Sequence, residues 1–130
     1  MKQRGFTVIE LLVVIVALIV IGIVGWQQFN EVQSVARDDK RRIAINTMYY
    51  NLEDIFYKTN KYYPETIDEK NLTSMDASLL TDPSGNKVGT GESDYRYEPV
   101  NCTDGHCKGY TLRADLEREA DFVKTNKENK

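Results

Sequence analysis

Hydrophobic and polar positions divide the chain into a uniformly apolar front and a mixed remainder. The run from Phe6 to Trp26 is apolar except for Glu10 near its start. As a helix it would measure about 31 Å, which is enough to cross the hydrocarbon core of a bilayer. A charged side chain inside such a segment costs about 2.5 to 3.5 kcal/mol or more, so Glu10 predicts a partner or a function.

Beyond Trp26 the apolar residues lie on one side of a helix. They recur at spacings of three and four, with two aromatic residues widening the stripe: Ile45, Met48, Leu52 and Ile55, then Tyr49 and Phe56. No proline occurs before Pro64, so the spacing predicts a nearly continuous helix from Phe6 to about Lys58. Its second half should carry the globular part of the chain.

The pattern then breaks into a long loop and short strands. Residues 61–93 are rich in Pro, Gly, Ser, Thr and Asn, which indicates a surface loop with one short helical turn near Ser74 to Leu80. Two stretches then alternate with period two, Tyr95 to Glu98 and Tyr110 to Leu116. Asp104 and Gly105 between them favour an antiparallel hairpin.

We therefore expect an α+β fold, with a long N-terminal helix packed on a small antiparallel sheet. A third strand is predicted at Ala120 to Lys124, followed by a flexible tail. The expected divisions are a leader, a membrane half of the helix, an amphipathic half, a globular part of loop and sheet, and the tail: 1–5, 6–26, 27–60, 61–124 and 125–130.

The front of the chain resembles the class III signal of type IV pilins and pseudopilins. The resemblance rests on a basic leader, Gly5, Phe6 and the Glu10 carboxylate within the apolar run. It implies that a prepilin peptidase cuts after Gly5 and methylates the new amino terminus at Phe6. It also implies that Glu10 of an incoming subunit pairs with the Phe6 amine of a neighbour in a filament. Such pairing would fix the register between otherwise featureless apolar helices.

Flanking charge favours a cytoplasmic amino terminus weakly, and the resemblance supports the same orientation. Lys2 and Arg4 precede the run, whereas a basic cluster from Arg37 to Arg42 lies further along. We interpret that cluster as a solvated or subunit-facing helix surface. A cleaved secretory signal is disfavoured because the run exceeds a typical h-region and no small-residue cleavage site closes it.

Length and net charge limit the number of domains and the kinds of partner that the chain can have. The 130 residues are 41% hydrophobic and 28% charged, which allows an anchor and one small domain. The formal net charge is −3, and −5 for the side chains once Lys2 and Arg4 are removed with the leader. This balance argues against general nucleic-acid binding. Binding through a local basic patch at 37–42 remains an alternative.

The loop is similar to that of the major pseudopilin of type II secretion. The similarity lies in Tyr63–Pro64 after the helix, and in an Asp-Pro turn with Gly-Asn before the first strand, Asp82 to Asn86. Some relatives bind calcium near this loop, and four residues here offer oxygen ligands: Asp82, Asn86, Glu92 and Asp94. Turn formation without an ion is the favoured interpretation, so no cofactor or metal is expected.

Cys102 and Cys107 flank the predicted hairpin turn. In an exported chain, two cysteines so placed are expected to form a disulfide that pins the turn. A metal site would need His106 and Asp104 as further ligands, and this interpretation is disfavoured. The spacing is also not that of a redox-active pair.

No pattern indicates an enzyme. His106 is the single histidine, and no phosphate-binding glycine motif or zinc-protease motif occurs. Tyrosines gather around the end of the long helix at Tyr49, Tyr50, Tyr57, Tyr62 and Tyr63. Packing is their favoured role, with an adhesive or DNA-binding surface as the alternative.

Three functional hypotheses follow. The first is a structural pilin that is anchored in the cytoplasmic membrane before assembly, with its globular part outside the cytoplasm. It would then polymerise into a cell-surface filament with the help of pilus or secretion machinery. The second is a pseudopilin of a type II secretion or DNA-uptake system. The third is a solitary membrane-anchored binding module, which would leave Glu10 unexplained.

Overall fold

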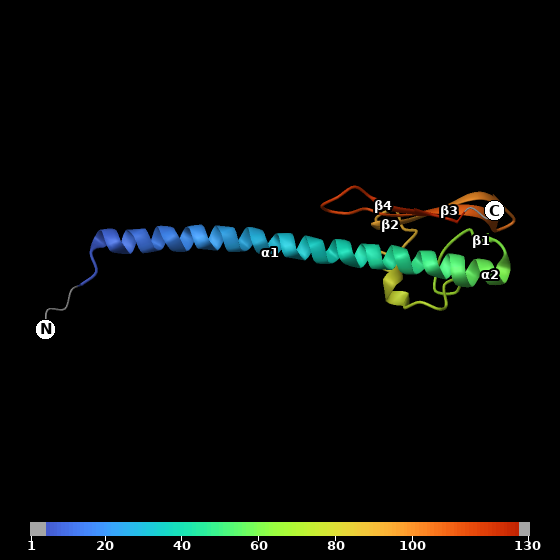
Figure 1. Ribbon diagram of the computed structural model, residues 1–130, viewed down its shortest axis with the longest axis horizontal. Coiled ribbons are helices and arrows are strands. Elements are labelled where there is room, and N and C mark those ends of the chain that lie inside the picture. Colours follow the sequence, from blue (N-terminus) through green and yellow to red (C-terminus); the bar gives the residue numbers. More distant parts are fainter. Residues whose placement is uncertain (1–4, 128–130) are drawn as a thin grey trace. The chain divides into compact units, whose positions relative to one another are not determined.

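The computed structural model describes residues 5–127, which form an α+β fold with one long N-terminal helix and a small antiparallel sheet (Figure 1). The chain divides into two compact units, Met1–Ser34 and Val35–Lys130. The predicted leader falls mostly on residues 1–4, outside the described residues.

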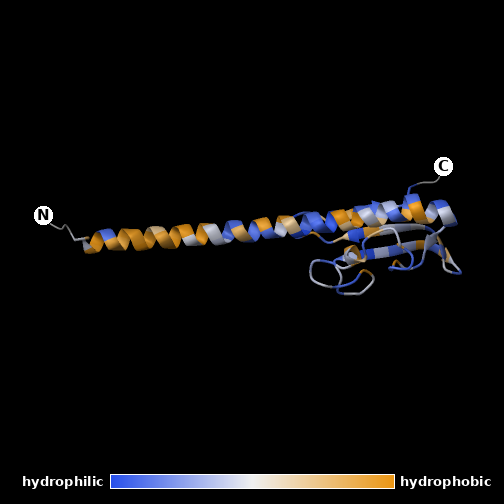
Figure 2. Ribbon diagram, turned by 90° about the horizontal axis from the view of Figure 1, so that it is seen from below, coloured by the Kyte–Doolittle hydropathy of each residue, from blue (hydrophilic) through white to orange (hydrophobic). Residues whose placement is uncertain are grey.

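The first unit consists, over its described residues, of a short lead-in and the first part of helix α1 (Val8–Tyr50). Figure 2 shows that the ribbon is mainly hydrophobic over the beginning of α1 and becomes mixed further along the helix. The helix begins at Val8 and not at Phe6 as expected, because Thr7 caps it. By length and composition, the helix over Val8–Asn60 could cross a membrane.

In the second unit the helix continues through the rest of α1, a π-helical turn η1 (Asn51–Phe56) and a last turn α2 (Tyr57–Asn60). The predicted apolar stripe is confirmed at Ile45, Met48 and Leu52, which are fully buried. The prediction is wrong for Ile55, which is 43% exposed. The π turn, with its i→i+5 hydrogen bonds, rotates the residues that follow relative to an α-helix and turns Ile55 away from the core.

The helix ends at Lys61, which adopts the left-handed conformation with φ 64° and donates its backbone N–H to the carbonyl oxygen of Tyr57. The chain then enters the predicted loop. Its short helical turn is confirmed as η2 (Ala77–Leu80), capped by the side chain of Asp76. The loop also contains a two-residue strand that the sequence did not predict, β1 (Tyr63–Pro64).

The predicted hairpin is confirmed as β2 (Tyr95–Thr103) and β3 (His106–Ala114). Its register runs from Tyr95 opposite Ala114 to Thr103 opposite His106. Asp104 and Gly105 form the turn with φ of 51° and 79°, the left-handed values that a two-residue hairpin turn needs. The second strand ends two residues before the expected Leu116.

The predicted third strand is present as β4 (Phe122–Thr125), which pairs with the end of β3 that includes Ala114. β1 pairs with the other end of β3, and β2 lies along the opposite side. The expected flexible tail began at Thr125, but this residue lies in β4. The backbone N–H groups of Asn126 and Lys127 also hydrogen-bond to Tyr110 and Glu53. The rest of the predicted tail, 128–130, lies outside the described residues.

The core of the second unit lies between the helix and the sheet. Its largest fully buried side chains come from the helix, the loop and both hairpin strands: Ile45, Met48, Leu52, Tyr63, Leu72, Tyr95, Tyr110 and Leu112. Three of the eight are tyrosines, so a thin core is filled by large rings. Each ring buries much apolar surface for one residue.

Candidate functional site

Thr7 begins helix α1. Its carbonyl oxygen accepts the backbone N–H of Leu11 at 3.1 Å, and its Oγ1 accepts the backbone N–H of Glu10 at 3.3 Å. A Thr followed three residues later by Glu is a helix-start signature that can be read from the sequence. Glu10 therefore lies in the first turn, where the helix dipole favours a negative charge.

The Glu10 side chain has no hydrogen-bond or ion-pair partner within residues 5–127. It is exposed and lines an open hollow of about 450 Å3 together with Gly5, Phe6 and Thr7. Phe6 is itself 79% exposed. The predicted cleavage and assembly residues thus lie side by side around one hollow, with a carboxylate open to a partner from outside the chain.

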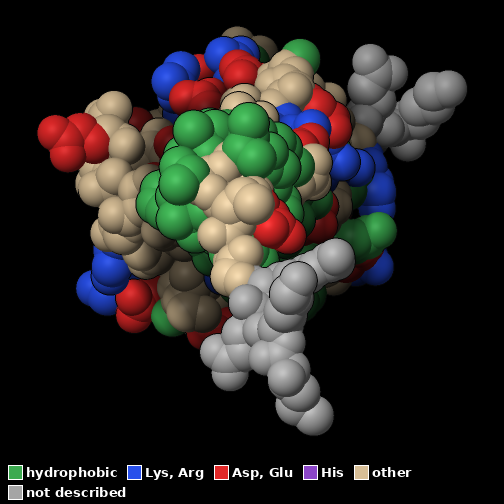
Figure 3. Space-filling model, turned by 90° about the vertical axis from the view of Figure 1, so that its left-hand side faces the viewer, with side chains coloured by type: hydrophobic (Ala, Val, Ile, Leu, Met, Phe, Trp, Pro, Cys, Tyr) green, Lys and Arg blue, Asp and Glu red, His purple; other side chains and the backbone are tan. Residues whose placement is uncertain are grey.

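The helix that carries this site has an unusual surface for a water-soluble protein. The large hydrophobic residues from Phe6, just before the helix, to Val24 within it are between 46% and 84% exposed. Figure 3 shows hydrophobic side chains gathered over the N-terminal end of helix α1. Apolar surface of this extent marks contact with a membrane or with other protein chains.

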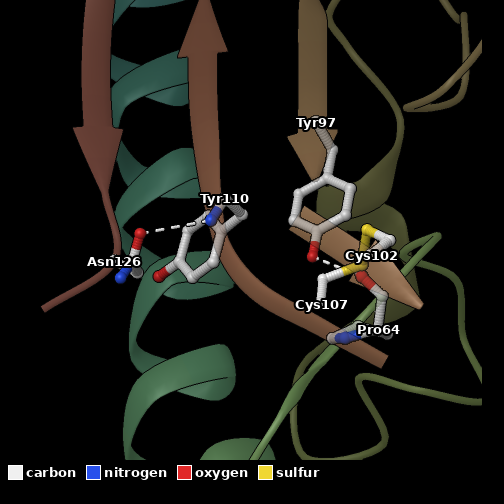
Figure 4. The surroundings of a disulfide bond; sticks show 6 residues. All are labelled: Pro64, Tyr97, Cys102, Cys107, Tyr110 and Asn126. Carbon is white, nitrogen blue, oxygen red and sulfur yellow. Dashed lines mark hydrogen bonds between the residues drawn. A yellow bond between two sulfur atoms is a disulfide. The ribbon is translucent and has the colours of Figure 1, made fainter. Parts of the chain in front are cut away.

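A second element of interest is the disulfide between Cys102 and Cys107, which lie opposite each other in the hairpin (Figure 4). This predicted bond is present. Next to it, the Tyr97 hydroxyl donates a hydrogen bond of 2.6 Å to the carbonyl oxygen of Pro64. The hairpin is therefore connected to β1 as well as closed on itself.

Two of the four possible calcium ligands, Asp82 and Asp94, have carboxylates that already bind protein groups. Asp82 is buried, and its carboxylate accepts backbone N–H groups from Ser84, Asn86 and Asp94 at 2.8 to 2.9 Å. Although burial alone would raise the pKa of Asp82, these hydrogen bonds lower it below its usual range. Within residues 5–127, no group of three or more His, Cys, Asp or Glu side chains is placed to hold a metal ion.

One member of the basic cluster from Arg37 to Arg42 does not fit the predicted solvated or subunit-facing helix surface. Arg41 is buried, and its guanidinium contacts Asp38, Asp94 and Glu117 at 2.8 to 2.9 Å. These hydrogen bonds outweigh burial and raise the pKa of Arg41. Lys40 in the same cluster is exposed as expected.

Glu53 is a buried carboxylate that sequence reasoning missed. It is 5% exposed and accepts hydrogen bonds from the hydroxyls of Tyr63 and Tyr110 at 3.1 and 2.8 Å, and from the backbone N–H of Lys127 at 3.1 Å. Burial and the contact with Glu53 raise the pKa of Tyr110. No local signal could have identified this role, since the partners lie 10, 57 and 74 residues away.

The tyrosines near the end of the helix mostly have the favoured packing role. Tyr63 is buried, with Tyr57 stacked on it at 4.8 Å between ring centroids and Tyr110 edge-on at 4.8 Å. Tyr50 is exposed, and Tyr62 is partly exposed beside His106.

Comparison of the chain with protein-family models, curated proteins and solved structures gives no significant match.

Proposed function

We propose that this chain is a structural subunit of a type IV pilus-like extracellular filament. The observation that carries the proposal is the exposed Glu10 carboxylate, which has no partner within residues 5–127 and lies on a helix whose large apolar residues up to Val24 are exposed. In a bundle of such helices, neighbouring copies would cover the apolar surface, and each Glu10 would meet the Phe6 amine of another copy. The proposal assigns no catalytic role to the chain.

Electrostatics supports this pairing more as a marker of register than as a source of net stability. Attraction between two unit charges grows steeply as the dielectric constant falls, but desolvation cancels much of the gain. A subunit that slides out of register would leave two buried charges unpaired. The stagger that pairs the two charges would therefore be strongly favoured over other staggers of the same helices.

The proposal requires a free amino terminus at Phe6, so the first test is the mass of the mature protein. We expect intact-mass analysis of filament or membrane fractions to show loss of residues 1–5 and one added methyl group on Phe6. A retained leader in both fractions would contradict the class III interpretation. An uncleaved protein produced without the peptidase gives the reference mass.

A pseudopilin of a type II secretion or DNA-uptake system is the second candidate. It is favoured by the turn that follows Leu80, in which Asp82 organises the chain up to Asn86 and Asp94, because the sequence there resembles the major pseudopilin. Immunogold electron microscopy separates the two candidates. Labelled long surface fibres support the pilin, whereas label confined to the envelope supports the pseudopilin.

A further inference from the structure

A hollow of about 360 Å3 lies between the end of the helix and the hairpin tip. Tyr57, Lys61 and Tyr62 line it from the helix end, and Asn101, Thr103 and Lys108 line it from the hairpin. The volume falls in the range of small-molecule sites. None of the roles described above uses this hollow.

The walls of the hollow are held in place by three separate constraints. The Cys102–Cys107 disulfide joins the two hairpin strands beneath it. Pairing of Tyr63 with Cys107 ties the segment after Lys61 to β3. The left-handed Lys61 closes the helix by donating its backbone N–H to the carbonyl of Tyr57 at 2.8 Å. A site fixed in this way loses little conformational entropy when a ligand binds.

The charge of the hollow is positive. Lys61 and Lys108 are both exposed, and neither has an ion-pair partner in the described part of the chain. No Asp or Glu is among the described lining residues. The two ammonium groups are therefore available to an anion from solution.

We infer that this hollow binds an acidic carbohydrate, meaning a sugar ring that carries a carboxylate or sulfate group. The ammonium groups of Lys61 and Lys108 would hold the acid through charge-assisted hydrogen bonds. The Asn101 amide and the Thr103 hydroxyl can both donate to and accept from ring hydroxyls. The partly exposed Tyr62 ring, held edge-on by His106 at 3.9 Å between centroids, offers an apolar surface for the C–H face of a sugar.

A nucleic acid fits these observations less well. Binding to a polyanion depends on many cations that neutralise successive phosphates. This hollow has two lysines, and the whole chain has a formal net charge of −3 that would repel an extended polyanion. A single acidic sugar needs only the local charge of the hollow.

The test uses the full chain in detergent micelles, titrated with glucuronic acid and with galactose 6-sulfate by saturation-transfer NMR. Methyl glucoside is the uncharged control, and a single-stranded oligothymidylate is the competing class. We expect both acidic sugars to bind, and methyl glucoside to bind about tenfold more weakly or not at all, since a hydrogen bond to a charged group is the stronger kind. Equal binding of methyl glucoside, or no binding of either acidic sugar, would overturn the inference without any variant.

Variants then locate the site. Lys61→Gln combined with Lys108→Gln should weaken acidic-sugar binding about tenfold or more, whereas the matched Lys40→Gln change on the exposed helix surface should leave it unaltered. Both substituted lysines are exposed, so the thermal midpoint should stay that of the parent protein. Unchanged sugar binding by the double variant, or tighter binding of oligothymidylate that depends on the same two lysines, would refute the assignment.

The site does not depend on filament assembly. It requires only that the globular unit lies outside the cytoplasm, where such sugars occur. Failure of sugar binding would thus leave the filament proposal standing, and failure of assembly would leave the binding site standing.

Discussion

Arg41 on helix α1 and Asp94, the residue before β2, form an ion pair with two contacts to one oxygen. Nη2 and Nε of Arg41 lie 2.8 and 3.0 Å from Oδ2 of Asp94. The other terminal nitrogen of Arg41 contacts Asp38 and Glu117. One buried cation therefore connects the helix, the entry to the sheet and the segment between β3 and β4.

Replacing Arg41 should destabilise the globular unit strongly. Arg41→Ala would leave Asp38 as a buried carboxylate without its cation and would remove a guanidinium that connects three segments. Breaking a buried ion pair in this way costs about 3 to 5 kcal/mol. We expect a loss of that size in the free energy of unfolding, measured by denaturant titration of the full chain in micelles and followed by near-ultraviolet circular dichroism.

Lys40→Ala is the control for this change, because Lys40 is the exposed neighbour of Arg41 in the same helix. It should alter the free energy of unfolding by no more than about 0.5 kcal/mol. If the two variants were equally stable, the ion-pair network would not be a stabilising element.

Glu53 gives a prediction of a different kind, because its partners are neutral hydroxyls and a backbone N–H. Glu53→Ala should cost about 2 to 5 kcal/mol, since it removes the carboxylate that accepts hydrogen bonds from the buried hydroxyls of Tyr63 and Tyr110. Glu53→Gln keeps a carbonyl oxygen in the same place and should cost less than half as much. Denaturant unfolding of the two variants side by side measures the difference.

A second measurement on Glu53→Gln follows the titration of tyrosine by ultraviolet difference absorbance. The negative charge of Glu53 and its hydrogen bond contribute to the raised pKa of Tyr110, so removing the charge should lower that pKa. An unchanged tyrosine titration would mean that Glu53 does not contribute to the raised pKa of Tyr110.

Local patterns in the sequence were sufficient for the elements but not for their polar contacts. The apolar stripe through Ile45, Met48 and Leu52 predicted the buried helix face, and Asp104–Gly105 predicted the hairpin turn that brings Cys102 opposite Cys107. In both cases the residues that predict the element are close together in the sequence. The alternation of Tyr95 and Tyr97 with charged residues predicted the first hairpin strand for the same reason.

One unpredicted feature depends on residues that are distant in sequence, and another depends on a local irregularity of the backbone. Arg41 resembles a surface arginine until Asp94 and Glu117, 53 and 76 residues away, are placed beside it. Ile55 satisfies an α-helical spacing and is exposed because the backbone widens into a π turn at Asn51. Neither the packing partner nor the backbone irregularity has a short-range signature.

The loop around Asp82 should lose stability in acid. The pKa of Asp82 is lowered in the folded protein, so the folded state binds this proton less readily than the unfolded state does. The stabilisation is therefore complete above the unfolded pKa of about 3.9 and is lost as pH falls below it. Asp82→Asn should be about 1 to 3 kcal/mol less stable near neutral pH, because its amide presents a donor to one of three N–H groups.

The difference between the parent protein and Asp82→Asn should shrink as the pH falls from about 5 to about 2, since protonation removes the same charge from the parent. Denaturant unfolding at several pH values measures this trend. Glu92→Gln, an exposed carboxylate in the same loop, is the control and should follow the parent protein throughout. A difference that stays constant with pH would exclude Asp82 as the titrating group.

The disulfide prediction can be tested on protein recovered from membrane or filament fractions, where the proposed function would place it. Non-reducing peptide mapping should recover Cys102 linked to Cys107, and alkylation without reductant should label neither. Replacing both cysteines by serine should cost about 2 kcal/mol, a modest amount because the bond closes a short loop. Free thiols in the exported protein would contradict the expectation.

Glu10 carries the functional argument, and its substitution separates membrane insertion from assembly. Glu10→Ala should leave the monomer in the membrane, since it removes a charge that is costly to bury. The globular unit should keep its fold, because Glu10 has no partner within the described residues. Entry into filaments should fall about tenfold or more, since the Phe6 amine of each neighbour would be buried without its counter-charge, and 1.4 kcal/mol already corresponds to a factor of ten.

Quantitative immunoblots of membrane and sheared-filament fractions measure the two steps separately. Membrane levels of Glu10→Ala should match the parent, while the filament fraction loses the subunit. Glu31→Ala, which removes a carboxylate from the same helix beyond the apolar run, is the matched control and should assemble normally. Normal filaments built entirely from Glu10→Ala subunits would refute the pairing with Phe6, because such filaments would hold their register without the only charge in the apolar run. Loss of the monomer from the membrane would also count against the proposed role, since it would place the contribution of Glu10 at insertion, before any neighbour is met.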